Sequence, residues 1–238
     1  MPATLLAFAA IHGAGGSVLI PSSRHRPEDI DLWRDQFEAD CLREPPLEKA
    51  LYEIERFVSE GPCYCSVSWG KDSVVVAWLT WRVSPATPLV WVRPSGAACP
   101  GCDAVRDVFL ANWPMEYFEP GCPMEVWNDP AISNAVAFQP ATDVVGTDRR
   151  IVGVRACESG VRKISMRTHG LATRNSRRPL GWMSEQDIFS IPAVHGLPTH
   201  PNYAMNGGGR WDRSRIRVAS IGGQWGDQFG RREWEAEY

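Results

Sequence analysis

The sequence lacks a run of about 18 consecutive apolar residues, the length that a helix needs to cross a lipid bilayer. We therefore expect no membrane-spanning segment. The first 20 residues are apolar, but no Lys or Arg precedes the hydrophobic stretch, and His12 and three glycines interrupt it. The pattern does not indicate a secretory signal peptide. The seven cysteines are odd in number and do not indicate a disulfide framework, so a reducing cytoplasm is the favoured location.

The charged residues are unevenly distributed. The net charge of −3 indicates neither a polyanion nor an anionic membrane as a partner. Residues 149–217, however, contain 13 of the 25 Lys and Arg residues and only four acidic residues. This basic segment is either a solvated surface or an anion site, for nucleotide phosphates or a nucleic-acid backbone. Composition alone does not decide between these alternatives.

Strand-like and helical patterns alternate after residue 61. We expect strands over 63–68, 88–93 and 149–155, and helices over 72–83, 102–113, 158–170 and 181–196. This alternation predicts an α/β fold, a parallel sheet with helices on both faces. Two further helices are expected, over 27–44 and 46–60. We divide the chain into an N-terminal helical extension, an α/β core and a Gly/Arg-rich C-terminal tail packed on the core, with bounds 1–60, 61–204 and 205–238.

The stretch "SWGKDS" (68–73) lies between an expected buried strand and an expected buried helix. It is not a Walker A loop, which requires Gly, four residues, then Gly-Lys-Ser/Thr. Cys65 stands at the first Gly position and Asp72 at the Ser/Thr position. A Gly-x-Gly-x-x-Gly dinucleotide fingerprint is also missing at the start of this helix.

The same stretch has the physical features of a phosphate site. A helix that begins at Asp72 or Ser73 presents free amide groups and the positive end of its dipole beyond the preceding strand. The hydroxyls of Ser68 and Ser73 can donate hydrogen bonds, and Lys71 supplies a compact positive charge. In a parallel sheet, ligands bind at the carboxyl ends of the strands, where this loop falls. A solvated turn is the alternative.

The loop resembles the Ser-Gly-Gly-Lys-Asp-Ser loop of the PP-loop ATP pyrophosphatases, with Trp69 in place of the middle glycine. "GVRACESGVRK" (153–163) is similar to the Gly-x-Arg-x-x-Glu-Ser-x-x-Arg element of the phosphoadenosine phosphosulfate (PAPS) reductase-like branch. Residues 178–204 resemble that branch's run of Pro, Trp, Asp-hydrophobic, Leu-Pro and Pro-x-Tyr. Together the matches span about residues 63–204. The C-terminal tail is similar to members of the branch from bacteriophage genomes.

The resemblance implies a parallel five-stranded sheet of the adenine nucleotide alpha hydrolase type. It assigns catalytic roles to Lys71 and Arg155, and phosphate or sulfate contacts to Arg155 and Arg162. Glu158 and Ser159 would organise the turn beside them. From the residues alone, Glu158 and Arg162 could form an ordinary ion pair on a helix surface. The full set of expected nucleotide-binding residues is Ser68, Trp69, Gly70, Lys71, Asp72, Ser73, Arg155, Glu158, Ser159 and Arg162.

The reductases of this branch need a cysteine near the C-terminus or four cluster ligands that include a Cys-Cys pair. This chain has no cysteine after Cys157 and no Cys-Cys pair, which disfavours reduction of PAPS. The remaining chemistry of the branch is AMP-forming cleavage of ATP with Mg²⁺. In that reaction an acceptor is adenylated and pyrophosphate leaves, without a protein nucleophile.

The sequence does not identify the acceptor. Because the branch has relatives in DNA phosphorothioation, the resemblance suggests sulfur transfer and nucleic-acid modification. The expected partners are a nucleotide, then a nucleic acid or a sulfur-donor protein, with a second copy of the chain also considered. A PAPS/APS reductase-like enzyme and a nucleotide-binding partner protein without turnover are the alternatives.

Four cysteines form a separate candidate site. Cys99-Pro-Gly-Cys102 has the spacing of metal ligands, and Cys122 and Cys157 could complete a zinc or iron-sulfur site. Alternatively, Cys99 and Cys102 flank a turn before a helix.

Overall fold

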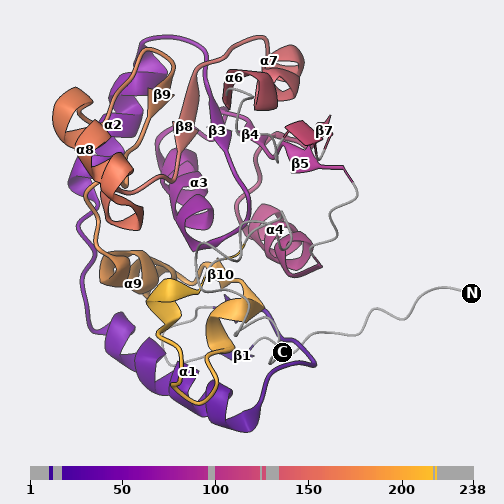
Figure 1. Cartoon of the computed structure of the whole chain (residues 1–238), viewed down its shortest axis with the longest axis vertical. Helices are drawn as coiled ribbons and strands as arrows, with labels where there is room; N and C mark the ends of the chain where they lie inside the picture. Colours follow the sequence, from indigo (N-terminus) through magenta and orange to yellow (C-terminus); the bar gives the residue numbers. More distant parts are fainter. Residues whose placement is uncertain are drawn as a thin grey trace, which may run out of the picture.

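The computed structural model describes residues 11–12, 18–95, 100–123, 125–126, 134–216 and 218. Within these residues the chain forms a five-stranded, all-parallel sheet in the order β6-β4-β3-β8-β9 (Figure 1). This confirms the predicted α/β class. The strands are β3 (Tyr64–Ser66), β4 (Leu89–Val90), β6 (Tyr117–Phe118), β8 (Arg150–Val152) and β9 (Ser176–Arg177).

Helices connect the parallel strands. The predicted helices are present with shifted ends, and the described helices are α1 (Pro27–Cys41), α2 (Glu48–Ser59), α3 (Lys71–Val83), α4 (Pro100–Asn112), α6 (Asn134–Ala137), α7 (Gln139–Val145), α8 (Gly160–His169) and α9 (Glu185–His195). Short 3-10 turns are η1 (Ala156–Glu158), η2 (Pro201–Ala204) and η3 (Arg213–Arg215). In Figure 1 the sheet occupies the upper part of the view and α1 the lower end, with α9 between them.

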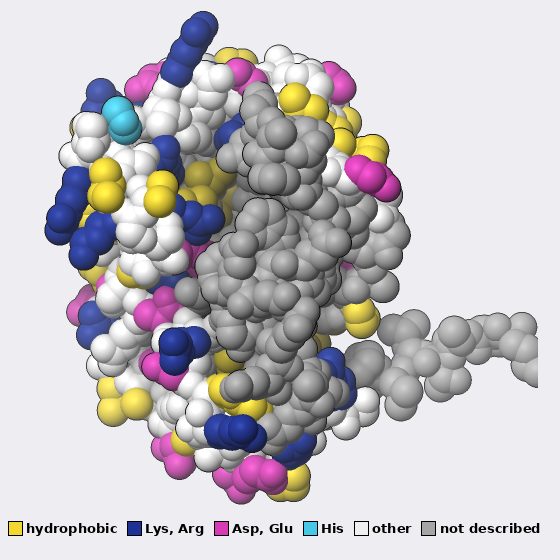
Figure 2. Space-filling view, in the orientation of Figure 1, with side chains coloured by type: hydrophobic (Ala, Val, Ile, Leu, Met, Phe, Trp, Pro, Cys, Tyr) yellow, Lys and Arg dark blue, Asp and Glu magenta, His cyan; other side chains and the backbone are white. Residues whose placement is uncertain are grey.

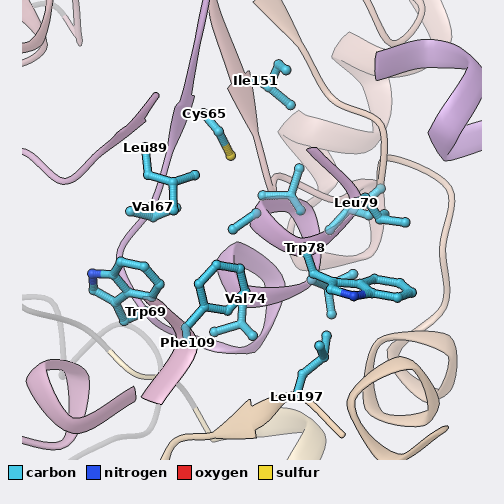
Figure 3. Close-up of a cluster of buried hydrophobic side chains, with 14 of the residues drawn as sticks. Cys65, Val67, Trp69, Val74, Trp78, Leu79, Leu89, Phe109, Ile151 and Leu197 are labelled. Atoms are coloured by element: carbon cyan, nitrogen blue, oxygen red, sulfur yellow. The ribbon is translucent and has the colours of Figure 1, made fainter. Parts of the chain in front are cut away.

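Side chains of successive residues in β3 pack on opposite faces of the sheet. Tyr64 belongs to a cluster with Val90 and with Ala141 of α7. Cys65 faces the other way, into the main core with Ile151 and with residues of α2, α3 and α4, part of which appears in Figure 3. Both faces are therefore covered by helices, as the alternation predicted.

The predicted strand over 88–93 is divided in two. Only Leu89–Val90 joins the central sheet, because Arg93–Pro94 (β5) pairs with β7 (Gly121–Cys122) in a separate parallel pair. A third sheet joins β1 (Ile11–His12), β2 (Val18–Leu19) and β10 (Pro198–Thr199). Within the residues that the structure describes, no helix is long and apolar enough to cross a membrane.

The N-terminal helix α1 shares a hydrophobic cluster with α9 and with residues 203–216. Trp33 and Phe37 of α1 pack with Phe189, and Met205 and Ile216 complete the cluster. Residues from both ends of the chain thus bury their apolar side chains together. The division of the chain at residues 60 and 204 stays a prediction.

The Lys and Arg residues of the basic segment 149–217 include buried or partly buried arginines in ion pairs and exposed cations on α8. Three of its arginines form ion pairs with acids of the N-terminal helical region: Arg149 with Glu60 at 3.1 Å, Arg177 with Glu53 at 2.8 Å and Arg213 with Asp40 at 2.6 Å. These cations hold the N-terminal helices against the core. On α8, by contrast, Arg162, Lys163 and Arg167 are exposed. Figure 2 shows Lys and Arg side chains at the position of α8, so this part of the segment forms an exposed basic surface.

Candidate functional site

A cavity of about 330 Å³ lies at the carboxyl ends of β3 and β8. The chain runs from β3 outward to β4 and β6 and then returns to β8 on the other side of β3. This reversal of strand order opens a crevice above the sheet, where α/β proteins bind ligands. The wall of this switch-point cavity contains apolar side chains, among them Trp91, Val92, Phe138 and Val152, and polar ones, Ser68, Asp72, Ser73 and Glu158.

The loop 68–73 leads from β3 to α3, and Trp69 is its most unusual residue. Its φ of 60° lies in the left-handed region, which costs a residue with a side chain about 1–2 kcal/mol. The Ser-Gly-Gly-Lys-Asp-Ser loop that this stretch resembles has a glycine at the position of Trp69, and glycine adopts this conformation without that cost. Trp69 therefore keeps a glycine-type backbone in this turn.

The ring of Trp69 turns away from the switch-point cavity. It is fully buried, with ring-centroid distances of 5.6 Å to Phe109 and 5.7 Å to Tyr117, and Figure 3 shows it beside Phe109 in the core. The indole Nε1 donates to the Tyr117 hydroxyl at 3.5 Å. Any contact of Trp69 with a nucleotide would therefore come from its main chain.

The helix α3 begins at Lys71, with Gly70 as its N-cap. The Ser73 hydroxyl donates to the Gly70 carbonyl at 2.9 Å, and the Lys71 amide donates to the Tyr203 hydroxyl at 3.3 Å. Tyr203 belongs to η2, so a residue from the C-terminal part of the chain supports the start of α3. The first turn of the helix borders the cavity through Asp72 and Ser73.

Four charged side chains form a closed ring beside this helix start. Lys71 Nζ lies 3.2 Å from Asp72 Oδ2 and 3.1 Å from Glu185 Oε1. The Arg155 guanidinium donates from Nε to Asp72 and from Nη2 to Glu185. The side chains of Lys71 and Arg155 are only 2% and 0% exposed. We call these four residues the ion ring; two cations and two carboxylates give it no net charge.

The charges of the ion ring control the ionisation of Asp72. Burial by itself raises the pKa of this carboxyl group, but Lys71 and Arg155 oppose it with their charges and hydrogen bonds. The result is a pKa below the ordinary value. Asp72 is therefore a carboxylate at neutral pH, and the ring stays neutral as a unit.

Glu158 and Ser159 organise the turn that follows Arg155. Glu158 accepts a hydrogen bond from the Arg155 amide at 2.9 Å, and Ser159 caps α8 by accepting from the Arg162 amide at 3.2 Å. The Arg162 side chain is 46% exposed and pairs with Glu158 four residues earlier. This is the helix-surface ion pair that the residues alone allowed. Phosphate binding by Arg155 and Arg162 stays a prediction.

The candidate cysteines do not come together. Cys102 is buried in the main core, whereas Cys122 is buried in the cluster on the opposite face of the sheet. Cys157 is an exposed residue whose sulfur lies 2.9 Å from Nη1 of Arg155. Partial burial of the thiol group raises its pKa. In the part of the chain that the structure describes, no three His, Cys, Asp or Glu side chains form a group that could hold a metal ion. Cys99 lies outside the described residues.

Comparison with known proteins gives a likeness to a solved structure. The sequence matches no protein-family model, and no curated protein matches it. Among solved structures, the chain is similar to an NH3-dependent NAD synthetase from Campylobacter jejuni subsp. jejuni NCTC 11168 in complex with the nitrate ion. The two are 14% identical, the match covers 74% of this chain and 77% of that chain, and the TM-score is 0.43. A likeness of this size does not identify a substrate.

Sequence reasoning missed two members of the site. Glu185 is one of the four acidic residues of the basic segment 149–217, and nothing in its surroundings in the sequence indicates that it would reach Arg155. Tyr203 had a signal, because it is the tyrosine of the Pro-x-Tyr element in the resemblance. Asp187, by contrast, has the local role expected of a first-turn acid: it forms a capping box with Ser184.

Gly153 sets the distance between β8 and the start of α3. A Cβ atom at this position would lie 2.8 Å from the Asp72 carbonyl oxygen and 3.2 Å from the Ser73 amide nitrogen. We expect Gly153→Ala to push these elements apart and to lower the free energy of unfolding by about 1–3 kcal/mol. Chemical denaturation measures this change. Gly160→Ala is the matched control, since a Cβ there meets no atom within 4 Å; equal stability of the two variants would contradict the close approach.

Proposed function

We propose that this protein binds ATP in the switch-point cavity and cleaves it between the α and β phosphates, with release of pyrophosphate. The observation that carries the proposal is the position of the loop 68–73. This loop joins the central strand β3 to the start of α3, directly beside a cavity at the switch point of the sheet. Amide groups at a helix start and a nearby lysine are the groups that bind phosphate in many α/β proteins.

The lining of the cavity contains groups that suit both ends of a nucleotide. Trp91, Val92 and Phe138 form an apolar part of the wall that offers contact area for a base, and Ser68 and Ser73 of the loop supply hydroxyl groups. A volume of about 330 Å³ lies at the small end of the usual range for ligand sites, about 300–1,000 Å³. We therefore place the base against the apolar wall and the phosphates at the start of α3.

Mg²⁺ is the ion that this chemistry implies. Mg²⁺ commonly binds through one or two carboxylates together with substrate phosphates and water. Asp72 lines the cavity, so a carboxylate that fits such an ion is present beside the expected position of the phosphates. When bound, Mg²⁺ would neutralise charge on the phosphates.

We further propose that the cleavage adenylates an acceptor, with a nucleic acid as the favoured class. The support is the exposed basic surface of α8. This helix begins two residues after Glu158, which lines the cavity. The phosphate backbone of a nucleic acid bound to this surface would lie close to the reacting nucleotide. Transfer of sulfur to the activated acceptor, from a donor protein, is the form of the reaction that the resemblance suggests.

Incubation with ATP and Mg²⁺, with and without DNA or RNA, tests this proposal. We expect AMP and pyrophosphate in equal amounts, measured by ion-exchange chromatography. ADP and orthophosphate as products would overturn it. A second candidate is a nucleotide-binding protein without turnover, favoured by the pairing of Lys71 and Arg155 with carboxylates; tight ATP binding without any product would support that reading.

A further inference from the structure

Glu185 joins the nucleotide loop to a distant helix. It is the first residue of α9, whose start is fixed by the capping box of Ser184 and Asp187. A carboxylate in the first turn of a helix is stabilised by the helix dipole. From this position the Glu185 carboxylate contacts Lys71 with one oxygen and Arg155 with the other.

The contacts of Arg155 leave no guanidinium nitrogen unengaged by the protein. Nε donates to Asp72, Nη2 donates to Glu185, and Nη1 donates to the sulfur of Cys157. Lys71 is likewise held between two carboxylates and is almost fully buried. Because the side chains of Lys71 and Arg155 are only 2% and 0% exposed, their remaining N–H donors are not open to solvent, and the positions that face both cations are held by carboxylate oxygens. A phosphate group would therefore reach both cations by taking the place of a carboxylate oxygen.

The two carboxylates differ in how easily they can be replaced. Asp72 is part of α3, lines the cavity and is adjacent to Lys71 in the chain. Glu185 comes from another helix, is not part of the cavity wall and has a longer side chain that is 22% exposed. Rotation of this side chain toward solvent would free one face of both cations. Asp72 would stay in place and keep them paired.

We propose that the Glu185 carboxylate holds, in the nucleotide-free protein, the position that a phosphate oxygen takes in the complex. This inference rests on the proposed function and deepens it. Glu185 is then a positioning residue that keeps Lys71 and Arg155 oriented, and also an internal competitor of the ligand. Because a carboxylate carries one negative charge, a ligand end with more charge displaces it better. The site should therefore favour a pyrophosphate end over a monophosphate.

Titration of the full chain with inorganic pyrophosphate in EDTA tests the exchange without a metal ion. Glu185→Gln keeps the size of the side chain and changes the ion ring from neutral to a charge of +1. Isothermal calorimetry should show pyrophosphate binding about tenfold tighter than to the wild type, because one competing charge near 3 Å has been removed. Without ligand, the melting temperature should fall, and pyrophosphate should raise it more than in the wild type.

Glu53→Gln is the matched control. It removes a carboxylate from another largely buried arginine, Arg177, at 2.8 Å, and Glu53 belongs neither to the ion ring nor to the cavity wall. This variant should lose stability with unchanged pyrophosphate affinity. If Glu185→Gln does not fold, Glu185→Asp, which withdraws the carboxylate by one methylene, should also bind pyrophosphate more tightly.

Equal or weaker pyrophosphate binding by the Glu185 variants would overturn the exchange and make Glu185 a purely structural partner. The proposed function is judged separately, by the release of AMP from ATP by the wild type. If the wild type forms AMP while the variants gain no affinity, only the exchange fails. If the wild type binds neither ATP nor pyrophosphate, the proposed function and the exchange both fail, because the exchange requires a phosphate-binding site.

Discussion

Replacement of Lys71 by Met is expected to lower the rate of AMP formation from ATP by about 100-fold or more, the size of effect seen when one preorganised group that stabilises transition-state charge is removed. Lys71 is the first residue of α3, and its ammonium group lies in the ion ring beside the cavity. The pyrophosphate that leaves carries more negative charge than the same β and γ phosphates carry within ATP. A cation that contacts it therefore stabilises the transition state more than the bound substrate.

Two further variants separate charge from fold in this experiment. Lys71→Arg retains a positive charge and should keep part of the activity. Lys163→Met removes an exposed lysine of α8 and should leave the rate of ATP hydrolysis unchanged when no nucleic acid is present. Melting temperatures show whether Lys71→Met is folded under assay conditions. A folded Lys71→Met protein with wild-type production of AMP would contradict the role of this lysine.

The structure of the loop 68–73 was predictable because its signals are local. A buried strand, a turn with Gly70 and an apolar helix follow one another within 20 residues, from 64 to 83. The same local patterns predicted the helices α1, α2, α3, α4, α8 and α9 and the strands β3, β4 and β8 to within a few residues, whereas α6 and α7 were not predicted. The strands β6 and β9 were missed, since each is only two residues long and shows no periodicity. Their place in the sheet depends on neighbouring strands and not on their own sequence.

The ion ring could not be predicted, because it depends on contacts between distant residues. Asp72 and Arg155 are 83 positions apart, and Glu185 is 30 positions beyond Arg155. The resemblance assigned roles to Lys71, Asp72 and Arg155, but it did not indicate that Asp72 pairs with the two cations or that Glu185 takes part. The orientation of Trp69 was equally open. Only the packing of its ring on Phe109 and Tyr117 decides that it turns into the core.

The basic segment shows the same limit of composition. Its arginines were expected either on a solvated surface or at an anion site. Arg177 and Arg213 instead bury most of their side chains in ion pairs with N-terminal acids. Burial of a cation depends on an acidic partner from another part of the chain. Counts of charged residues cannot reveal such pairs, although they did locate the exposed surface of α8.

Replacement of Arg155 by Met is expected to lower the free energy of unfolding at pH 7 by about 3–5 kcal/mol, the usual cost of removing one partner from a buried ion pair. The Arg155 side chain is fully buried and contacts both carboxylates of the ion ring. Without it, Lys71 is the one remaining cation of the ring against Asp72 and Glu185. Chemical denaturation measured by fluorescence gives the change.

The pH dependence of this loss identifies its cause. In the wild type the pKa of Asp72 lies below its ordinary value, with burial outweighed by Lys71 and Arg155. The group therefore stabilises the fold above the unfolded pKa of about 4, and this stabilisation disappears as the pH falls through the lower folded pKa. In Arg155→Met, burial of Asp72 is less opposed, so its pKa rises and protonation in mild acid relieves the destabilisation. The difference in stability between the two proteins should thus be largest at neutral pH and shrink toward pH 4.

Arg177→Met is the matched comparison for this pH series. Arg177 is also nearly buried, but one of its partners, Glu60, is 45% exposed and also pairs with Arg149 at 3.1 Å. Glu60 keeps this second arginine and its contact with water when Arg177 is removed, so the loss of stability should be smaller and should vary less with pH. A loss in Arg155→Met that is the same from pH 4 to pH 8 would show that Arg155 contributes through packing of its side chain. In that case the charges of Asp72 and Glu185 would not require Arg155, and the ion ring would not be a single electrostatic unit.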